Sequence, residues 1–157
     1  MLRKARRPDY LLNLELKGAK KYQLVLAAKI AAMDQAGEFR GLRVTVSSFN
    51  HTALRALRRQ SPAIPVAPLW NGRGRFSPVL KTARALQAEA VHLAARAVTV
   101  RRIEAIPQAG WVLRVYPVHD PAPAKTLAAL GVRALLRGDQ GGATAAAAWS
   151  WVLKMLQ

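Results

Sequence analysis

The sequence predicts an α/β protein built on a sheet of parallel strands. Short apolar runs with the period of a strand alternate along the chain with longer runs that have the period of a helix. This alternation is typical of βαβ units, whose strands are parallel. A chain of 157 residues, of which 52% are apolar, is also long enough to bury one hydrophobic core.

Residues 11–17 predict the first strand, and its side chains carry the first chemical signal. A period of two separates them into an apolar set (Leu12, Leu14, Leu16) and a polar set (Asn13, Glu15, Lys17). A carboxylate buried without a partner is costly, so Glu15 predicts a use such as a metal ion, a proton or a salt bridge. A half-exposed edge strand, with Glu15 and Lys17 in water, is the alternative.

The elements that follow are predicted from periodicity and from helix and turn signals. Asn50 is a good amino-terminal cap for a helix that directs Leu54 and Leu57 to the core. The prolines of segment 64–70 predict an irregular or strand-end role for it. In chain order, the predicted elements are a helix over 20–35, a strand over 41–49, a helix over 51–60, the extended segment 64–70, a Gly-rich loop over 71–75, a helix over 78–88, a strand over 90–93, a helix over 100–108 interrupted near Pro107, a strand over 111–118, a helix from Asp120 to Gly131, a strand over 132–136 and an apolar helix over 143–157.

The chain is strongly basic. It has 25 Lys and Arg residues against 8 Asp and Glu residues, which gives a formal net charge of +17. This charge favours anionic partners such as nucleic acid, phosphate esters or an acidic membrane surface. The basic residues nevertheless form dispersed clusters, which is typical of a solvated outer face.

Several classes of protein are excluded or disfavoured. Cysteine is absent, so disulfides, thiolate metal sites and a cysteine nucleophile are excluded. The basic first residues precede an apolar stretch that Asn13, Glu15 and Lys17 interrupt, which makes a poor signal peptide. No run of about 18 uncharged apolar residues is present, so we expect no transmembrane segment and a cytoplasmic location.

Other polar groups give weaker signals. His51 follows a helix cap and is predicted at the surface, whereas His92 ends a short strand that could line the mouth of a barrel. The loop 71–75 could cradle a phosphate through backbone amides and Arg73, but it lacks the Lys-Ser/Thr ending of a phosphate-binding loop, which favours a surface turn. No general acid, general base or Ser/His/Asp triad is assigned, so we expect no catalytic residue in this chain.

Six segments, read in order, resemble the carboxy-terminal part of the glycerophosphodiester phosphodiesterase family. Their order and spacing carry the resemblance over nearly all of residues 11–138. The segments are Leu12-Asn13-Leu14-Glu15-Leu16-Lys17, residues 46–50 (Val-Ser-Ser-Phe-Asn), residues 64–70 (Ile-Pro-Val-Ala-Pro-Leu-Trp), residues 88–93 (Ala-Glu-Ala-Val-His-Leu), residues 109–120 (Ala-Gly-Trp-Val-Leu-Arg-Val-Tyr-Pro-Val-His-Asp) and residues 130–136 (Leu-Gly-Val-Arg-Ala-Leu-Leu).

The resemblance implies a partial TIM-type (β/α) barrel whose amino-terminal strands are missing. The expected domains are a basic arm over 1–10, the partial barrel over 11–142 and the apolar helix over 143–157. The implied activity is metal-dependent hydrolysis of glycerophosphodiesters to glycerol 3-phosphate and an alcohol, with a role in lipid and glycerol metabolism. Glu15 matches a ligand of the family's divalent metal, Mg²⁺ or Ca²⁺, and Lys17 matches the basic residue two places on. The resemblance also implies that Tyr116 and His119 lie at the substrate-binding rim.

The chain departs from the family in ways that bear on activity. The family's His-Arg-Gly segment, its Glu-x-Asp metal pair and a second catalytic histidine precede the segment that matches here, and none is present. The usual Trp-Thr-Val-Asn is replaced by Tyr116-Pro117-Val118-His119, and a later Thr-Asp by Arg137-Gly138-Asp139. We therefore expect a phosphoric diester hydrolase relative that is truncated and inactive alone.

Two other hypotheses remain open at this point. The chain could be a basic, non-catalytic module that binds nucleic acid or an anionic membrane surface, although no recognised nucleic-acid motif is present. It could also complete a barrel with an amino-terminal half, or associate with itself, because a partial barrel leaves open sheet edges.

Overall fold

The computed structural model describes residues 11–116, 132, 134 and 135. The predicted arm over 1–10, the helix from Asp120, the apolar helix over 143–157 and His119 lie outside these residues. The chain divides into two compact units, one of residues 1–69 and 76–89 and one of residues 70–75 and 90–157. Each unit is described by itself.

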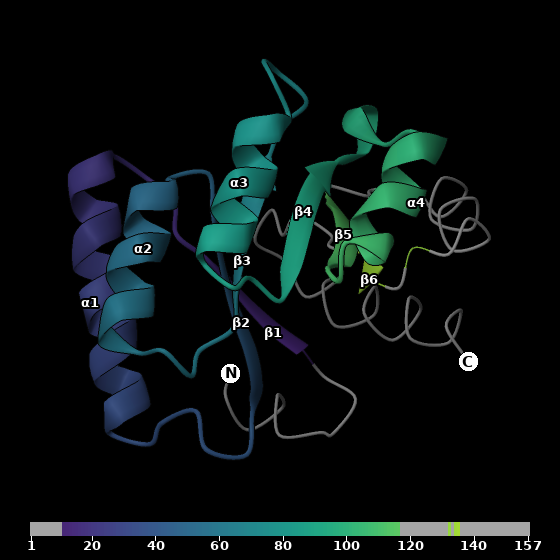
Figure 1. The fold of residues 1–157 in the computed structure, drawn as a ribbon. Helices are drawn as coiled ribbons and strands as arrows, with labels where there is room; N and C mark the ends of the chain where they lie inside the picture. Colours follow the sequence, from purple (N-terminus) through teal and green to yellow (C-terminus); the bar gives the residue numbers. More distant parts are fainter. Residues whose placement is uncertain (1–10, 117–131, 133, 136–157) are drawn as a thin grey trace, which may run out of the picture. The chain divides into compact units, whose positions relative to one another are not determined.

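The first unit contains three parallel strands that pair in chain order (Figure 1). They are β1 (Leu11–Glu15), β2 (Arg43–Ser48) and β3 (Val66–Trp70), whose last residue belongs to the second unit. Glu15 is the register partner of Ser47, and Ser47 is in turn the partner of Ala67. The parallel strands confirm the predicted sheet.

Three helices belong to this unit, of which α1 (Lys20–Gln35) connects β1 to β2, α2 (His51–Gln60) connects β2 to β3, and α3 (Ser77–Ala85) follows β3. Helices α1 and α2 lie side by side (Figure 1). The predicted cap of α2 is confirmed, because Asn50 Oδ1 accepts hydrogen bonds from the amides of Thr52 at 3.2 Å and Ala53 at 3.4 Å. Leu54 and Leu57 are fully buried, as the periodicity predicts.

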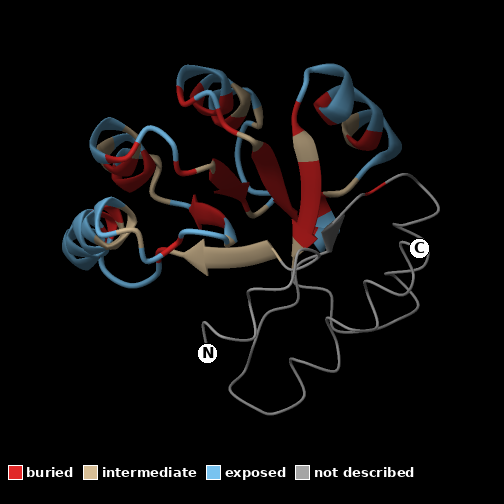
Figure 2. Cartoon of the chain, turned by 90° about the horizontal axis from the view of Figure 1, so that it is seen from below, coloured by how far each residue is buried: buried red, intermediate tan, exposed pale blue. Residues whose placement is uncertain are grey.

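Burial is greatest on β2 and β3 and on the helix faces toward them (Figure 2). Strand β1 differs, because all five of its residues are only half-buried. Leu16, one residue beyond the strand, is buried and anchors its carboxyl end to the core.

Helix α1 buries an unexpected face. Its buried residues are Gln23, Ala27 and Ala31, whereas an apolar stripe of Tyr22, Val25 and Leu26 is 57%, 65% and 40% exposed. Leu24 shares the helical spacing of Ala27 and Ala31 in the sequence, but its side chain is 43% exposed. Ala27 and Ala31 are small and lie on the buried face, whereas Tyr22, Val25 and Leu26 are exposed.

The second unit contains β4 (Ala90–Ala94), β5 (Val112–Tyr116) and β6 (Ala134–Leu135), which also pair in parallel and in chain order. A short 3-10 turn, η2 (Ala95–Ala97), leads from β4 toward helix α4 (Val100–Gln108). Thr99 caps α4, because its hydroxyl accepts a hydrogen bond from the Arg102 amide at 3.3 Å. No helix in the described part of the chain is long and apolar enough to cross a membrane.

Two proline predictions need correction. Segment 66–70 is a regular, fully buried strand that includes Pro68, and not an irregular segment. Proline removes a donor but keeps its carbonyl, and the Pro65 carbonyl accepts from the Val46 amide at 2.9 Å. Pro107 lies in the last turn of α4 without ending it, since the helix continues to Gln108.

Candidate functional site

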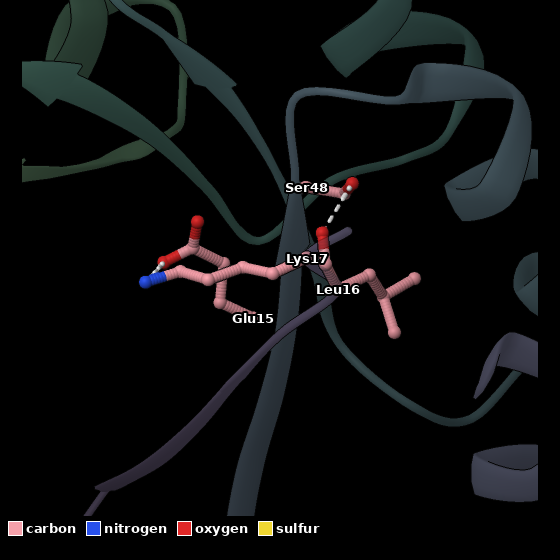
Figure 3. A network of polar contacts seen from close by, with 4 residues as sticks. All are labelled: Glu15, Leu16, Lys17 and Ser48. Atoms are coloured by element: carbon pink, nitrogen blue, oxygen red, sulfur yellow. Dashed lines mark hydrogen bonds and ion pairs between the residues drawn. The ribbon is translucent and has the colours of Figure 1, made fainter. Parts of the chain in front are cut away.

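Glu15 and Lys17 form an ion pair at the carboxyl end of β1. The Lys17 Nζ lies 3.3 Å from Glu15 Oε2, and the side chain of Lys17 is 70% exposed whereas that of Glu15 is 26% exposed. Figure 3 shows both side chains on one side of the strand, with Leu16 on the other. The predicted alternation of side chains is therefore present at this end of the strand.

A polar network fixes the turn that follows Glu15. The Leu16 amide donates to the Ser47 carbonyl at 2.8 Å, and the Leu16 carbonyl lies 3.2 Å from the Ser48 hydroxyl (Figure 3). The same hydroxyl lies 3.2 Å from Gln23 Oε1 and accepts from the Asn50 amide at 3.0 Å. Gln23 in turn donates to the Gly18 carbonyl at 2.6 Å. These bonds connect β1, α1 and β2 immediately behind the ion pair.

The face of the sheet that carries Glu15 is polar. Register partners on parallel strands point to the same face, so Asn13 shares its face with Thr45, and Glu15 shares its face with Ser47. Asn13 Oδ1 and Ser47 Oγ are buried and have no hydrogen-bond partner within the described part of the chain. The face therefore holds polar atoms whose hydrogen-bonding capacity the described residues do not use.

The second unit places a histidine and an arginine together in its interior. His92 on β4 is the register partner of Arg114 on β5, both are buried, and His92 Nε2 lies 3.4 Å from Arg114 Nη1. Burial, reinforced by the charge of Arg114, holds the pKa of His92 well below its usual value. No local sequence signal connects these two residues, although each is the polar residue at the centre of an apolar strand.

The remaining predicted residues have different environments. Tyr116 ends β5 and is half-buried, and His119 lies outside the described residues. His51 is predicted at the surface, but it is half-buried and its Nε2 is buried. Burial lowers the pKa of His51, and a hydrogen bond with the Leu69 backbone opposes this shift. The surface prediction for His51 is therefore wrong.

The described residues do not make a metal centre by themselves. No group of three or more His, Asp or Glu side chains gathers in residues 11–116, 132, 134 and 135. Glu15 supplies one carboxylate, and Ca²⁺ or Mg²⁺ sites in proteins use several oxygen ligands. A metal at Glu15 therefore requires ligands from elsewhere.

A surface pocket in the first unit lies away from Glu15. It is formed at the amino ends of the strands by residues that include Leu11, Arg43 and Pro65, and Asp34 and Glu89 also contribute to its wall. The carboxyl ends of parallel strands, where Glu15 lies, are the usual location of functional groups in (β/α) folds. This pocket is therefore not the candidate site.

Comparison with protein-family models gives one match. Residues 11–138 match the glycerophosphoryl diester phosphodiesterase family, and this range covers most of the chain. No match is found among curated protein sequences.

Solved structures of similar fold agree with this match. A phosphodiesterase from Oleispira antarctica, solved with its product sn-glycerol-3-phosphate, is 22% identical with a TM-score of 0.70, and the match covers 82% of this chain and 51% of that one. A candidate glycerophosphodiester phosphodiesterase from Galdieria sulphuraria is 19% identical with a TM-score of 0.72, and the match covers 87% and 56%. A glycerophosphodiester phosphodiesterase from Parabacteroides distasonis is 16% identical with a TM-score of 0.66, and the match covers 94% and 58%.

The chain thus spans about half the length of the solved structures that it matches. Its α/β fold with parallel strands is a partial TIM-type barrel, as predicted. The family model, the order of the strands and helices and the similarity to these structures agree, and the chain belongs to the glycerophosphoryl diester phosphodiesterase family.

Proposed function

We propose that this chain supplies the carboxy-terminal half of a barrel that hydrolyses glycerophosphodiesters to glycerol 3-phosphate and an alcohol. The observation that carries the proposal is the Glu15–Lys17 ion pair at the carboxyl end of β1. The contacts of Ser48 with Leu16 and Gln23 hold the backbone next to this pair. A carboxylate and an ammonium group in contact suit a site that holds both a metal ion and a phosphate. The family match over residues 11–138 supports the reaction class.

The proposed roles follow from charge and position. Glu15 contributes one oxygen ligand to a divalent metal, Mg²⁺ or Ca²⁺, which would polarise the phosphodiester when bound. Lys17, at 70% exposed, is accessible to a phosphate and offsets its negative charge. Tyr116 and His119 are the proposed substrate contacts of the second unit. No general acid or base is assigned within this chain.

We infer that the chain is inactive alone and needs a complementing amino-terminal half. Two features of the first unit support the inference that a complementing half packs against it. Strand β1 is half-buried throughout, and the stripe of Tyr22, Val25 and Leu26 on α1 is exposed although it is apolar. Neighbouring helices of a (β/α) barrel form a continuous outer ring, so an adjacent helix is the natural cover for such a stripe.

The first experiment measures turnover and product binding by the chain in parallel. The purified chain is incubated with glycerophosphocholine and either Mg²⁺ or Ca²⁺, and we expect no release of glycerol 3-phosphate. Robust turnover would refute the inactivity. In parallel, sn-glycerol 3-phosphate is titrated into isotope-labelled protein, and we expect shifts of the Glu15 and Lys17 resonances that weaken in Lys17→Gln.

A matched variant distinguishes this assignment from attraction to a basic protein in general. Arg55→Gln on α2 removes the same charge at an exposed position and should leave the Lys17 shifts unchanged. If the two variants weaken binding equally, or if Lys17 does not respond, the proposed phosphate site is refuted.

Self-association is tested separately by light scattering after size-exclusion chromatography. If the α1 stripe mediates contact between copies, replacing Val25 and Leu26 with lysine should abolish it. Val100→Lys, which alters an equally exposed apolar residue of α4, should not. If the chain is monomeric at every concentration tested, the stripe does not bind a second copy. The complementing half then remains the proposed partner of the stripe.

A further inference from the structure

The loop after β3 is held in a defined position against the turn after β4. The Trp70 Nε1 donates to the Arg73 carbonyl at 2.9 Å, and the Arg96 Nε donates to the Asn71 carbonyl at 2.9 Å. Gly72 approaches the turn so closely that a Cβ there would lie 3.0 Å from the Ala97 Cβ. Loop 71–75 and turn η2, which follows the carboxyl end of β4, therefore form one connected surface of the second unit.

Helix α4 adds its first turn to the same surface. The Arg102 guanidinium lies 4.7 Å from the centroid of the Trp70 ring, and its Nη1 donates to the Ala97 carbonyl at 2.6 Å. Trp70 is itself only 6% exposed. The Trp70 ring, the one aromatic ring in residues 70–75 and 95–102, is thus buried, and the Arg102 guanidinium covers it.

The surface carries a concentration of positive charge without an acidic residue. Residues 70–75 and 95–102 contain no Asp or Glu. Their arginines, called the arginine platform below, are Arg73, Arg75, Arg96, Arg101 and Arg102. All except Arg102 are exposed, and none of these four forms an ion pair with a carboxylate of the described residues.

We propose that the arginine platform docks the protein on an anionic phospholipid surface. Exposed arginines gain attraction from a layer of negative headgroups, and the effect of each is additive near the membrane. Val100, which is 62% exposed and adjacent to Arg101, adds an apolar contact at the same place. This role does not depend on the proposed hydrolase function.

Two alternative ligands fit the platform less well. Single-stranded nucleic acid is bound through exposed aromatic rings on which bases stack, and the Trp70 ring is covered by Arg102. A single small phosphate needs donors that converge on one point. Here Arg96 and Arg102 donate to backbone carbonyls, and the other arginines come from separate segments. An extended layer of negative headgroups suits these separated arginines better than a single phosphate does.

Co-sedimentation of the full chain with vesicles tests the proposal. Vesicles of phosphatidylcholine alone are compared with vesicles that contain phosphatidylcholine and phosphatidylglycerol in a 7:3 ratio. We expect binding to the anionic vesicles only, weakened by added NaCl. Each arginine near the surface is worth about fivefold in binding, so the Arg73→Glu, Arg75→Glu double variant should reduce the partition coefficient by more than about tenfold.

A control of equal charge separates the platform from the net charge of the whole chain. The Arg55→Glu, Arg59→Glu double variant changes two exposed arginines of α2 in the first unit. It should reduce binding far less than the loop variant. Equal losses for the two double variants would overturn the proposal, as would absence of binding to anionic vesicles.

Two further measurements keep the test decisive. Arg101→Glu places an acidic residue in the first turn of α4, where it is electrostatically tolerated, and should weaken vesicle binding even if the loop variant fails to fold.

In the second measurement, a single-stranded RNA oligonucleotide is added to the vesicle assay as competitor at the same salt concentration. If RNA binds more tightly than the vesicles and displaces them, the platform is a nucleic-acid surface and the lipid assignment is wrong.

Discussion

Arg114 donates a hydrogen bond to His92 across the buried β4–β5 pair, with 3.4 Å between Nη1 and Nε2. A guanidinium has no acceptor, so His92 must receive this bond on an unprotonated Nε2 and carry its hydrogen on Nδ1. The pair therefore requires a neutral imidazole, in agreement with the lowered pKa of His92.

The first prediction concerns acid stability. The unfolded chain binds a proton at His92 near its ordinary pKa of 6.5, whereas the folded chain resists it. The free energy of unfolding should consequently fall as the pH drops below 6.5, by at most about 1.4 kcal/mol per pH unit from this residue. Urea unfolding between pH 7.5 and 5 measures the slope, which His92→Asn should reduce. An unchanged slope in this variant would contradict the assignment.

The second prediction contrasts two neighbouring serines. Ser48→Ala removes a buried hydroxyl that accepts from the Asn50 amide and can donate to the Leu16 carbonyl or to Gln23 Oε1, and should cost about 1–3 kcal/mol of unfolding free energy. Ser47→Ala removes a hydroxyl that has no partner within the described residues, and should be nearly neutral. Thermal and urea unfolding of both variants give the comparison, and a larger loss for Ser47→Ala would contradict the network described above.

The third prediction concerns the loop that carries the arginine platform. Gly72 has φ +87°, and an added Cβ would press against Ala97 at 3.0 Å, whereas Gly74 has φ +71° with no described atom within 4 Å. Both alanine variants should lose about 1 kcal/mol from the left-handed backbone, and Gly72→Ala should lose more. Equal losses would show that the loop does not contact η2 in solution.

The fourth prediction concerns the proposed metal ligand. Glu15→Gln breaks an ion pair whose lysine is 70% exposed, and such pairs contribute less than about 1 kcal/mol to stability. Unfolding should therefore be almost unchanged, while any response to Mg²⁺ in the glycerol 3-phosphate titration should disappear. A large loss of stability would instead make Glu15 a structural residue.

The sequence predicts the parts of this fold that depend on local signals. The range of α1 and the Asn50 cap of α2 follow from periodicity and capping chemistry, and the opposite orientation of Glu15 and Leu16 follows from the strand period. The shared side of Glu15 and Lys17 also follows from this period, although β1 itself ends at Glu15.

The errors and omissions concern long-range packing. Pro68 lies in the fully buried strand β3, although the prolines of this segment, taken alone, predict an irregular or strand-end role. His92 and Arg114 are 22 residues apart, and only the register of β4 and β5 brings them together. The exposure of Leu24 on α1 is also set by long-range packing, because spacing alone does not show which side of a helix contacts the sheet.

The exposed stripe of Tyr22, Val25 and Leu26 has a practical consequence for work at the bench. Exposed apolar side chains on a helix adsorb to plastic, chromatography resin and detergent micelles. Assays of this protein should therefore be run over a dilution series with a carrier protein present, so that loss of material is not mistaken for loss of activity.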